Sequence, residues 1–297
     1  MAREFPAAPP IGIIAYSDFY DLPEQRVWGD YWFKENLIRE FSGAGYPVDN
    51  RSPKIVLHLF GEPRPDLPSD TYNILWLHSH PDWINTDILR KYQKIYCISS
   101  HFTQKLNDRG FDADFLMIPT NMTPTQCDKK YDIVFVGNTR QNKMRKIIND
   151  LGNSPYRVKI WGWGWKGLIP DEWYGGQYYE NARLNQLYAA SKIVLNDHHD
   201  DMKREGFINP RVLDALASGG FVVSDQVHGM NDFLDNSVPT YETREELEKT
   251  IDRFIRDDTG RERLAERGRK IALQYTYAAC CGEIIRHINS ISGTLFL

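Results

Sequence analysis

The chain has 297 residues, which is long for a single hydrophobic core and sufficient for two domains of ordinary size. Its 41% hydrophobic and 26% charged residues are typical of a soluble globular protein. The net charge of −4 gives no general attraction to nucleic acid or anionic lipid, so we expect no nucleic-acid partner. An anionic ligand must therefore be held by a local cluster of positive groups.

The cysteines indicate a reducing compartment. Cys97, Cys127, Cys280 and Cys281 show no Cys-x-x-Cys spacing, so we expect four reduced thiols. The Pro- and Ala-rich N-terminus lacks the pattern of a signal peptide, and no apolar stretch approaches the length of a membrane span. We therefore expect a cytoplasmic protein, with peripheral membrane contact left open.

The first half of the chain alternates between strand and helix patterns. Short apolar runs predict strands at 11–15, 54–60, 72–77, 94–99 and 115–118. Helical patterns fall at 29–44, 86–92 and 100–109. The stretch 119–130 is rich in Pro, Thr and Asn without apolar periodicity, so we place a domain boundary within it and predict a first domain over 1–126.

The same alternation then restarts. Apolar runs predict strands at 132–136, 157–161, 192–196 and 221–224. Helical patterns fall at 181–190, 210–218, 243–255, 260–274 and 277–291, with a further basic helix after Asn138. The sequence thus predicts an α/β protein of two doubly wound, Rossmann-like domains, the second over 127–276. Ligands bind beyond the carboxyl ends of such strands, so facing sheets would line a shared cleft.

The stretch from Glu205 to Gly220 predicts a loop and a short helix. Pro210 is tolerated in the first helical turn because its missing N–H is not needed there, and Gly219 with Gly220 ends the helix. Glu205 lies nine positions before Asp214, and two such acids can flank one sugar nucleotide.

Arg211 and Asp214 project from one side of this helix because they are three residues apart. The helix N-terminus adds about half a positive charge and free N–H groups. Together these groups suit a nucleotide diphosphate, with Asp214 accepting hydrogen bonds from ribose hydroxyls. The alternative is an Asp–Arg pair that only stabilises the helix start.

A second candidate for phosphate binding follows the strand at 132–136. Gly137 and Asn138 let the backbone approach a ligand, and Arg140, Lys143 or Arg145 can neutralise its charge. The alternative is a solvated basic face of the predicted helix.

The sequence Trp161-Gly-Trp163-Gly-Trp165 ends another predicted strand. Trp161 or Trp163 could stack on a nucleobase, although core packing is the commoner use of tryptophan. The acidic and His-containing loop 196–201 has no familiar metal-ligand spacing, so we expect no metal there.

Four positions in the first half are candidates for chemistry. Asp30 starts the helix after the first strand and can face an acceptor, or it can serve only as a helix cap. His78 and His80 follow the strand at 72–77 and point in opposite directions if the chain is extended. Asp82 follows Pro81 and can cap the next helix.

The motifs as a group resemble the GT-B glycosyltransferases, in particular the spore-maturation (CgeB-like) group of the retaining "group 1" branch. The resemblance is carried by 132–138, 160–165, 187–196 and 209–220, with looser matches at 28–30 and 75–82.

The resemblance implies a donor site on the second domain, an acceptor site on the first, and no metal requirement. Asn209, Arg211 and Asp214 would belong to the donor site, with Asp214 at the ribose, and His78 or His80 would approach the transferred sugar. The final segment, 277–297, would pack back on the first domain. The sequence departs from the family in two ways: the family has two Glu eight positions apart, whereas Glu205 and Asp214 are nine apart and the second acid is Asp.

We therefore predict retaining glycosyl transfer from a nucleotide-diphosphate sugar, with UDP or GDP as the nucleotide and no permanently bound cofactor. The acceptor would be a glycan, a lipid-linked molecule or a small molecule. If the enzyme inverts, Asp30 is the first candidate for the general base and Asp82 the second. Two alternatives stay open: a nucleotide-sugar 2-epimerase, and a non-catalytic two-domain sugar-binding protein, which the missing signal peptide disfavours.

Overall fold

The computed structural model describes residues 8–22, 24–63, 67–68 and 70–295, which fall into two compact units. Unit 1 comprises Met1–Ile118 and Tyr277–Leu297, and unit 2 comprises Pro119–Thr276. Each unit is built on its own parallel sheet, of five strands in unit 1 and six in unit 2. The predicted α/β class with two parallel sheets is confirmed.

The sheet of unit 1 runs in sequence order, and all its neighbouring strands are parallel. Its strands are β1 (Ile11–Ile14), β2 (Ile55–Phe60), β3 (Tyr72–Leu77), β4 (Lys94–Cys97) and β5 (Ala113–Phe115). Every residue of β2 and β4 is buried, as expected for parallel strands covered on both faces.

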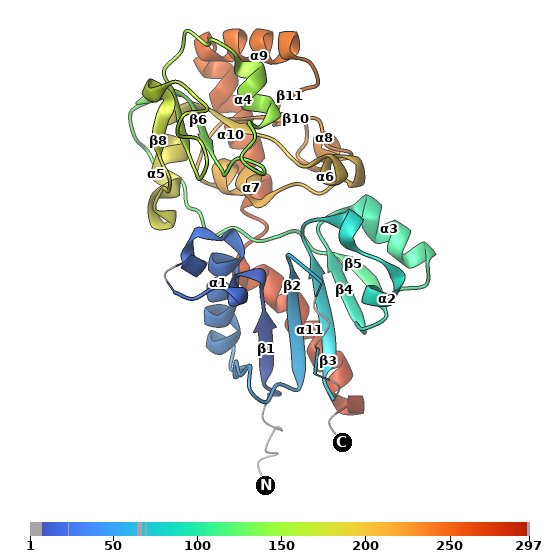
Figure 1. Ribbon diagram of the computed structural model, residues 1–297. Helices are drawn as coiled ribbons and strands as arrows, with labels where there is room; N and C mark the ends of the chain where they lie inside the picture. The colour runs from blue at the N-terminus through green and yellow to red at the C-terminus, as the bar shows by residue number, and fades with distance from the viewer. Residues whose placement is uncertain (1–7, 23, 64–66, 69, 296–297) are drawn as a thin grey trace. The chain divides into compact units, whose positions relative to one another are not determined.

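Helices cover this sheet, and two that are far apart in sequence pack together. They are α1 (Gly29–Gly43), α2 (Thr86–Leu89), α3 (Ser100–Asp108) and α11 (Tyr277–Leu295), with short 3-10 turns at Tyr16–Phe19, Glu24–Val27 and Pro81–Trp83. The helix α1 buries Phe33, Leu37 and Phe41 at intervals of four residues and packs against α11 (Figure 1). The Phe33 ring makes an edge contact with Tyr277, at the start of α11.

The sheet of unit 2 has the order β11-β10-β9-β6-β7-β8, again parallel throughout. Its strands are β6 (Tyr131–Val136), β7 (Val158–Trp161), β8 (Tyr174–Gly176), β9 (Ser191–Asn196), β10 (Val222–Asp225) and β11 (Thr240–Tyr241). The order reverses between β6 and β9. The loops at the carboxyl ends of these two strands diverge there, which makes this point the usual place for a ligand.

Short helices connect the strands of unit 2. They are α4 (Lys146–Leu151), α5 (Leu184–Ala189), α6 (Asp200–Glu205), α7 (Pro210–Ala217), α8 (Met230–Phe233), α9 (Arg244–Arg256) and α10 (Asp258–Ala272), with 3-10 turns at Asp171–Trp173 and Asn181–Arg183. The helix α7 starts at Pro210 as predicted, and its apolar residues Val212, Leu213 and Leu216 are fully buried. It packs extensively against α10.

The prediction of a basic helix directly after Asn138 is wrong. Arg140 and Lys143 instead close a tight turn with two main-chain hydrogen bonds of 3.2 and 2.9 Å. Gln141 and Asn142 lie in the left-handed region, with φ of 52° and 58°, a conformation that ends a helix. The helix α4 therefore begins only at Lys146, and Arg145 is its N-cap.

The cysteines described by the structure are free thiols: Cys97, Cys280 and Cys281 are buried and Cys127 is exposed. Within the described part of the chain, no helix has both the length and the apolar character needed to cross a membrane.

Gly162 has no room for a side chain. Its φ is 143°, and a Cβ there would lie 2.2 Å from the carbonyl oxygen of Gly137. We predict that Gly162→Ala lowers the free energy of unfolding by about 2–4 kcal/mol in denaturant titrations, because the ends of β6 and β7 must separate. Gly282→Ala is the matched control: Gly282 is inside α11 with open space around it, so Ala should be neutral or stabilise by about 0.5–1 kcal/mol. Equal stabilities for the two variants would contradict this account.

Candidate active site

A buried ion pair lies at the carboxyl ends of β6 and β9. The Nε of Arg145 donates to Asp197 Oδ1 at 2.7 Å, and its Nη2 donates to the same oxygen. The Nη2 also donates to the Asp197 main-chain carbonyl, at 3.0 Å. Burial alone would raise the pKa of Asp197, but the charge and hydrogen bonds of Arg145 lower it below its usual value. Asp197 is therefore an ionised carboxylate inside the protein.

Arg211, from the first turn of α7, joins this pair. Its Nη1 donates to Asn196 Oδ1 at 2.8 Å. The guanidinium groups of Arg211 and Arg145 each lie 5.2 Å from the centre of the Phe135 ring. Burial, and then the charge of Arg145, lower the pKa of Arg211 to about 10, so it still carries its charge at neutral pH.

Arg140 is the third guanidinium of the cluster and has unused donors. Its Nη2 is 3.9 Å from Asp197 Oδ1, and among the described residues its buried Nε and Nη2 have no hydrogen-bond partner. Burial and the neighbouring Arg145 lower the pKa of Arg140. Three arginines thus surround one carboxylate, which leaves a net positive charge and free N–H groups at the switch point of the sheet. Such a group is suited to bind an anion.

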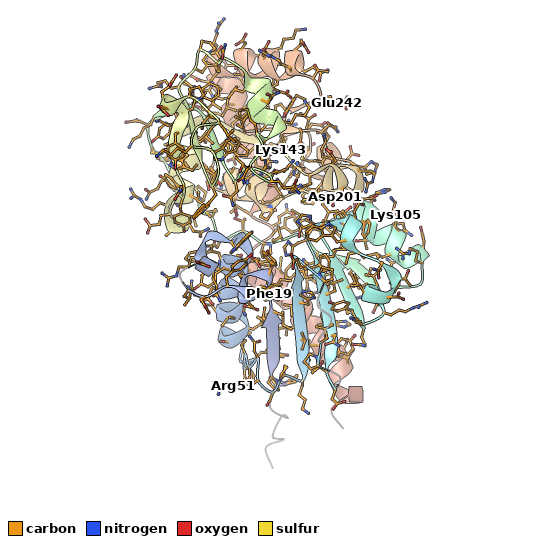
Figure 2. The ribbon with its side chains drawn as sticks, in the orientation of Figure 1. Phe19, Arg51, Lys105, Lys143, Asp201 and Glu242 are labelled. Atoms are coloured by element: carbon orange, nitrogen blue, oxygen red, sulfur yellow. The ribbon has the colours of Figure 1, made fainter. Side chains whose placement is uncertain are left out.

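Lys143 does not share this environment. Lys143, labelled in Figure 2, is exposed on the turn that follows β6, whereas Arg140 is partly buried and Arg145 is buried. We refer below to Arg140, Arg145, Arg211 and Asp197 as the arginine cluster.

A buried histidine supports the loop before α7. The main-chain N–H of Asn209 donates to His198 Nε2 at 3.1 Å, so the ring proton is on Nδ1 and is donated to Asp225 Oδ1 at 2.7 Å. The Asn209 side chain donates to the Asp197 carbonyl at 3.1 Å, and its buried Oδ1 has no partner among the described residues. These bonds connect the N-terminus of α7 with the arginine cluster.

Asp197 and His198 lie in the loop 196–201, for which the sequence predicted only that it holds no metal, and Asp225 was not among the predicted site residues. The available signal was that polar residues end two neighbouring strands, with Asn196 at the end of β9 and Ser224-Asp225 at the end of β10. Because carboxyl ends of parallel neighbours meet at one edge of the sheet, these polar groups come together.

Asp214 is partly buried on α7 and is held by a residue distant in sequence. The Thr120 hydroxyl donates to Asp214 Oδ1 at 2.6 Å. Burial raises the pKa of Asp214 to about 6, and the Thr120 hydrogen bond and the charge of Arg211 only partly oppose this rise. Arg211 and Asp214 therefore have different hydrogen-bond partners: Arg211 bonds to Asn196 at the end of β9, and Asp214 bonds to Thr120.

Glu205 ends α6 and is buried. Its Oε1 accepts a hydrogen bond from Arg204 Nε at 3.0 Å. Glu205 thus lies between the end of β9 and the start of α7, directly before Gly206, which is the C-cap of α6.

A cavity of about 390 Å³ opens beside the turn 138–142. It is lined by Asn138, Thr139, Gln141, Asn142, Trp163, Gly164, Lys166, Tyr174 and Gln177. Asn138 connects two of the lining segments, because its Oδ1 accepts a hydrogen bond from the Trp163 main-chain N–H at 2.9 Å. Trp163 is 50% exposed, whereas Trp161 is buried between Tyr131 and Tyr179.

Gly137 brings the end of β6 close to its neighbours. A Cβ on Gly137 would lie 2.8 Å from Arg211 Nη2, and the Gly137 carbonyl accepts from Trp165 Nε1 at 2.7 Å. Trp165 is fully buried, so it packs in the core of unit 2.

In unit 1, Asp30 and Ser17 meet beyond the carboxyl end of β1. Asp30 Oδ2 accepts from the Ser17 main-chain N–H at 2.8 Å, and burial raises the pKa of Asp30 despite this bond. Asp30 is not the residue that caps α1, since Trp28 holds the N-cap position.

His78 and His80 follow β3 in different environments. His78 contacts the Phe33 ring, and its buried Nε2 has no hydrogen-bond partner among the described residues. Burial, and then the charge of nearby His80, lower the pKa of His78 to about 4, so it is neutral at pH 7. His80 adopts a left-handed backbone conformation and stacks on Trp83 at 3.9 Å, and Asp82 lies on the exposed 3-10 turn between them.

The described residues include no group of three or more His, Cys, Asp or Glu arranged to hold a metal ion.

Comparison with known proteins agrees with this architecture. Residues 140–286 match the family described as "Glycosyl transferase-like". No curated protein sequence matches the chain significantly.

Solved structures of similar fold cover nearly the whole chain. Sucrose-phosphate synthase from Thermosynechococcus elongatus has a TM-score of 0.69 at 12% identity, and the match covers 96% of this chain and 100% of the synthase chain. HepE from Anabaena, in complex with UDP and glucose, has a TM-score of 0.66 at 12% identity (95% and 100% covered). An α-glucosyltransferase in complex with UDP and a 13-mer DNA has a TM-score of 0.66 at 10% identity (95% and 100% covered).

The family match and the structural neighbours agree on one class of fold. Residues 140–286 match the glycosyl transferase-like family, and the chain has the two-sheet GT-B fold of the glycosyltransferases that it resembles.

The raised pKa of Asp214 predicts a measurable cost in stability. An acid whose pKa is higher in the folded state than in the unfolded state destabilises the fold when it ionises, and this loss disappears as the pH falls through about 6 toward 4. We predict that Asp214→Asn, which keeps an acceptor for Thr120, stabilises the ligand-free protein by about 1–2 kcal/mol at pH 8. The gain should shrink toward zero near pH 4. Denaturant titrations across this pH range measure it, and a variant less stable than wild type at pH 8 would refute it.

Proposed function

We propose that the chain transfers a sugar from a nucleotide-diphosphate sugar to an acceptor hydroxyl, with retention of configuration and without a metal ion. The observation that carries this proposal is the arginine cluster at the switch point of the unit 2 sheet. Its two buried donor groups on Arg140 lack partners among the described residues, and its net charge is positive. A diphosphate supplies acceptors and the opposite charge.

The cluster also supports metal-independent chemistry. Breaking the bond between sugar and diphosphate leaves extra negative charge on the phosphate oxygens. Guanidinium groups from Arg140, Arg145 and Arg211 can stabilise that charge, as a divalent cation does in other enzymes. Their positions are preorganised by Asp197, Asn196 and the Phe135 ring.

The remaining parts of the donor have natural places in unit 2. We assign the ribose to Asp214, whose carboxylate can accept hydrogen bonds from its two hydroxyls. We assign the base to the cavity beside Asn138 and Trp163, because the exposed indole offers a face for stacking and the amides offer donors and acceptors. Trp163 suits this role better than the buried Trp161. UDP is our first choice of nucleotide, since structural neighbours are described with UDP.

In a retaining reaction, the leaving diphosphate accepts the proton of the acceptor hydroxyl on the face where the new bond forms. No protein nucleophile is then needed. The neutral His78 is proposed to bond a sugar hydroxyl through its unpartnered Nε2. Glu205 and Asn209 complete the proposed donor site through the loop before α7.

The inverting alternative has one observation in its favour. Asp30 has a raised pKa, which brings it closer to the value that suits a general base at neutral pH. In that case Asp30 takes the acceptor proton and the diphosphate leaves from the opposite face.

Arg140 provides the sharpest test of the donor site. We predict that Arg140→Ala weakens binding of UDP-glucose by about 10–100-fold in calorimetry, the scale of one or two charge-assisted hydrogen bonds. The melting temperature should change little, because its buried donors bond to nothing in the described structure. Arg157→Ala is the control, since Arg157 pairs with Asp132 at the start of β7, the opposite edge of the sheet. If both variants bind like wild type, the cluster does not hold the diphosphate.

Stereochemistry separates the two mechanisms. We expect NMR of the first-formed product to show the anomeric configuration of the donor, and Asp30→Asn to keep at least about a tenth of the wild-type turnover. An inverted anomer together with a loss of about 10²–10⁴-fold in Asp30→Asn would establish Asp30 as the base instead.

A further inference from the structure

Thr120 is a buried residue that lies where the chain enters unit 2. It is 4% exposed, and its main chain is fixed to the segment by which the chain leaves the unit: Thr120 N donates to Tyr275 O at 2.9 Å, and Thr120 pairs with Thr276 in a parallel bridge. Its position is therefore set independently of α7, the helix that carries Asp214.

The direction of the Thr120 hydroxyl is fixed by its two hydrogen bonds. Its oxygen accepts from the Met122 main-chain N–H at 3.1 Å, so the single hydroxyl proton remains for Asp214 Oδ1 at 2.6 Å. A hydroxyl that donates to a carboxyl oxygen favours the charged form of that acid. The Met122 contact occupies one of the two lone pairs of the hydroxyl and so helps to hold its orientation.

We propose that Thr120 is a positioning residue for Asp214, keeping its carboxylate charged and oriented to receive the ribose hydroxyls of the donor. This inference rests on the proposed function, in which Asp214 binds the ribose. Thr120 itself does not touch the donor in this scheme and acts through the acid.

The electrostatic surroundings make this hydrogen bond consequential. Burial places the pKa of Asp214 at about 6, close to neutral pH. The other charged or titratable groups that act on it are Arg211 from α7 and Tyr188 from α5, and Arg211 is already bonded to Asn196. Removing the Thr120 hydroxyl therefore lets burial raise the pKa of Asp214 further, and the acid becomes partly protonated at neutral pH.

The test compares donor binding as a function of pH in Thr120→Val and Thr120→Ser. Valine keeps the shape and removes the donor, and serine restores it. Binding of UDP-glucose is measured by calorimetry from about pH 5 to about pH 8, where its two diester phosphates do not titrate. GDP-mannose replaces it if the wild type does not bind UDP-glucose.

We expect wild-type affinity to fall as the pH drops through about 6, because the carboxylate becomes protonated. In Thr120→Val the midpoint should move up by roughly one pH unit, giving about fivefold weaker binding at pH 6, about twofold weaker binding at pH 7 and near-normal binding at pH 8. Thr120→Ser should restore the wild-type profile. Thr103→Val, which removes another buried Thr hydroxyl on α3 of unit 1, should leave the profile unchanged.

Asp214→Asn separates failure of this inference from failure of the proposed site. If Asn at 214 leaves donor affinity unchanged, or if the wild type binds neither nucleotide sugar, the ribose assignment fails and the role of Thr120 fails with it. If Asp214→Asn weakens binding but Thr120→Val has the wild-type midpoint, only the inference about Thr120 is overturned. A loss in Thr120→Val that is the same at every pH also overturns it, because a purely structural role predicts that result.

Discussion

The ion pair between Arg145 and Asp197 is the interaction on which the proposed donor site of unit 2 depends. Three guanidinium groups converge at the ends of β6 and β9, and their mutual repulsion in a partly dehydrated site would be severe without a carboxylate among them. Asp197 offsets part of that repulsion, and Asp225 and Asp200 add negative charge near Arg140. A buried pair of this kind contributes little net stability and mainly fixes geometry. Its value here is that it holds the arginines ready for an anion.

The helix α7 connects this cluster with the rest of the proposed site. Its N-terminus rests on His198 through Asn209, its first turn carries Arg211, and its second turn carries Asp214. The two charged residues are held by partners on different elements, Asn196 at the end of β9 and Thr120 at the entry to the unit. A helix anchored at both points can hold a cation and an acid at fixed separation. Burial raises the pKa of Asp214, so the ionised acid is less favourable here than in water, and perturbed acids of this kind are common in functional sites.

Unit 1 shows the same physical pattern with different groups. Burial keeps His78 neutral and raises the pKa of Asp30, so each is shifted toward its uncharged form. His78 is thus a neutral hydrogen-bonding group at pH 7, and the pKa of Asp30 lies above its usual value. Asp30 accepts a hydrogen bond from Ser17, and His78 contacts the Phe33 ring.

The sequence by itself determined the fold class, most strand positions and the start of α7, because apolar periodicity, Pro210 and the glycine pair at 219–220 act locally. It also indicated which loops carry the candidate residues, since these follow predicted strands. Tertiary structure decided the partners. The turn through Gln141 and Asn142 replaces the expected basic helix and directs Arg140 and Arg145 to Asp197, more than 50 residues away. The bond between Thr120 and Asp214 spans 94 residues, and no local pattern encodes it. Such contacts depend on strand order and burial, which are properties of the folded chain.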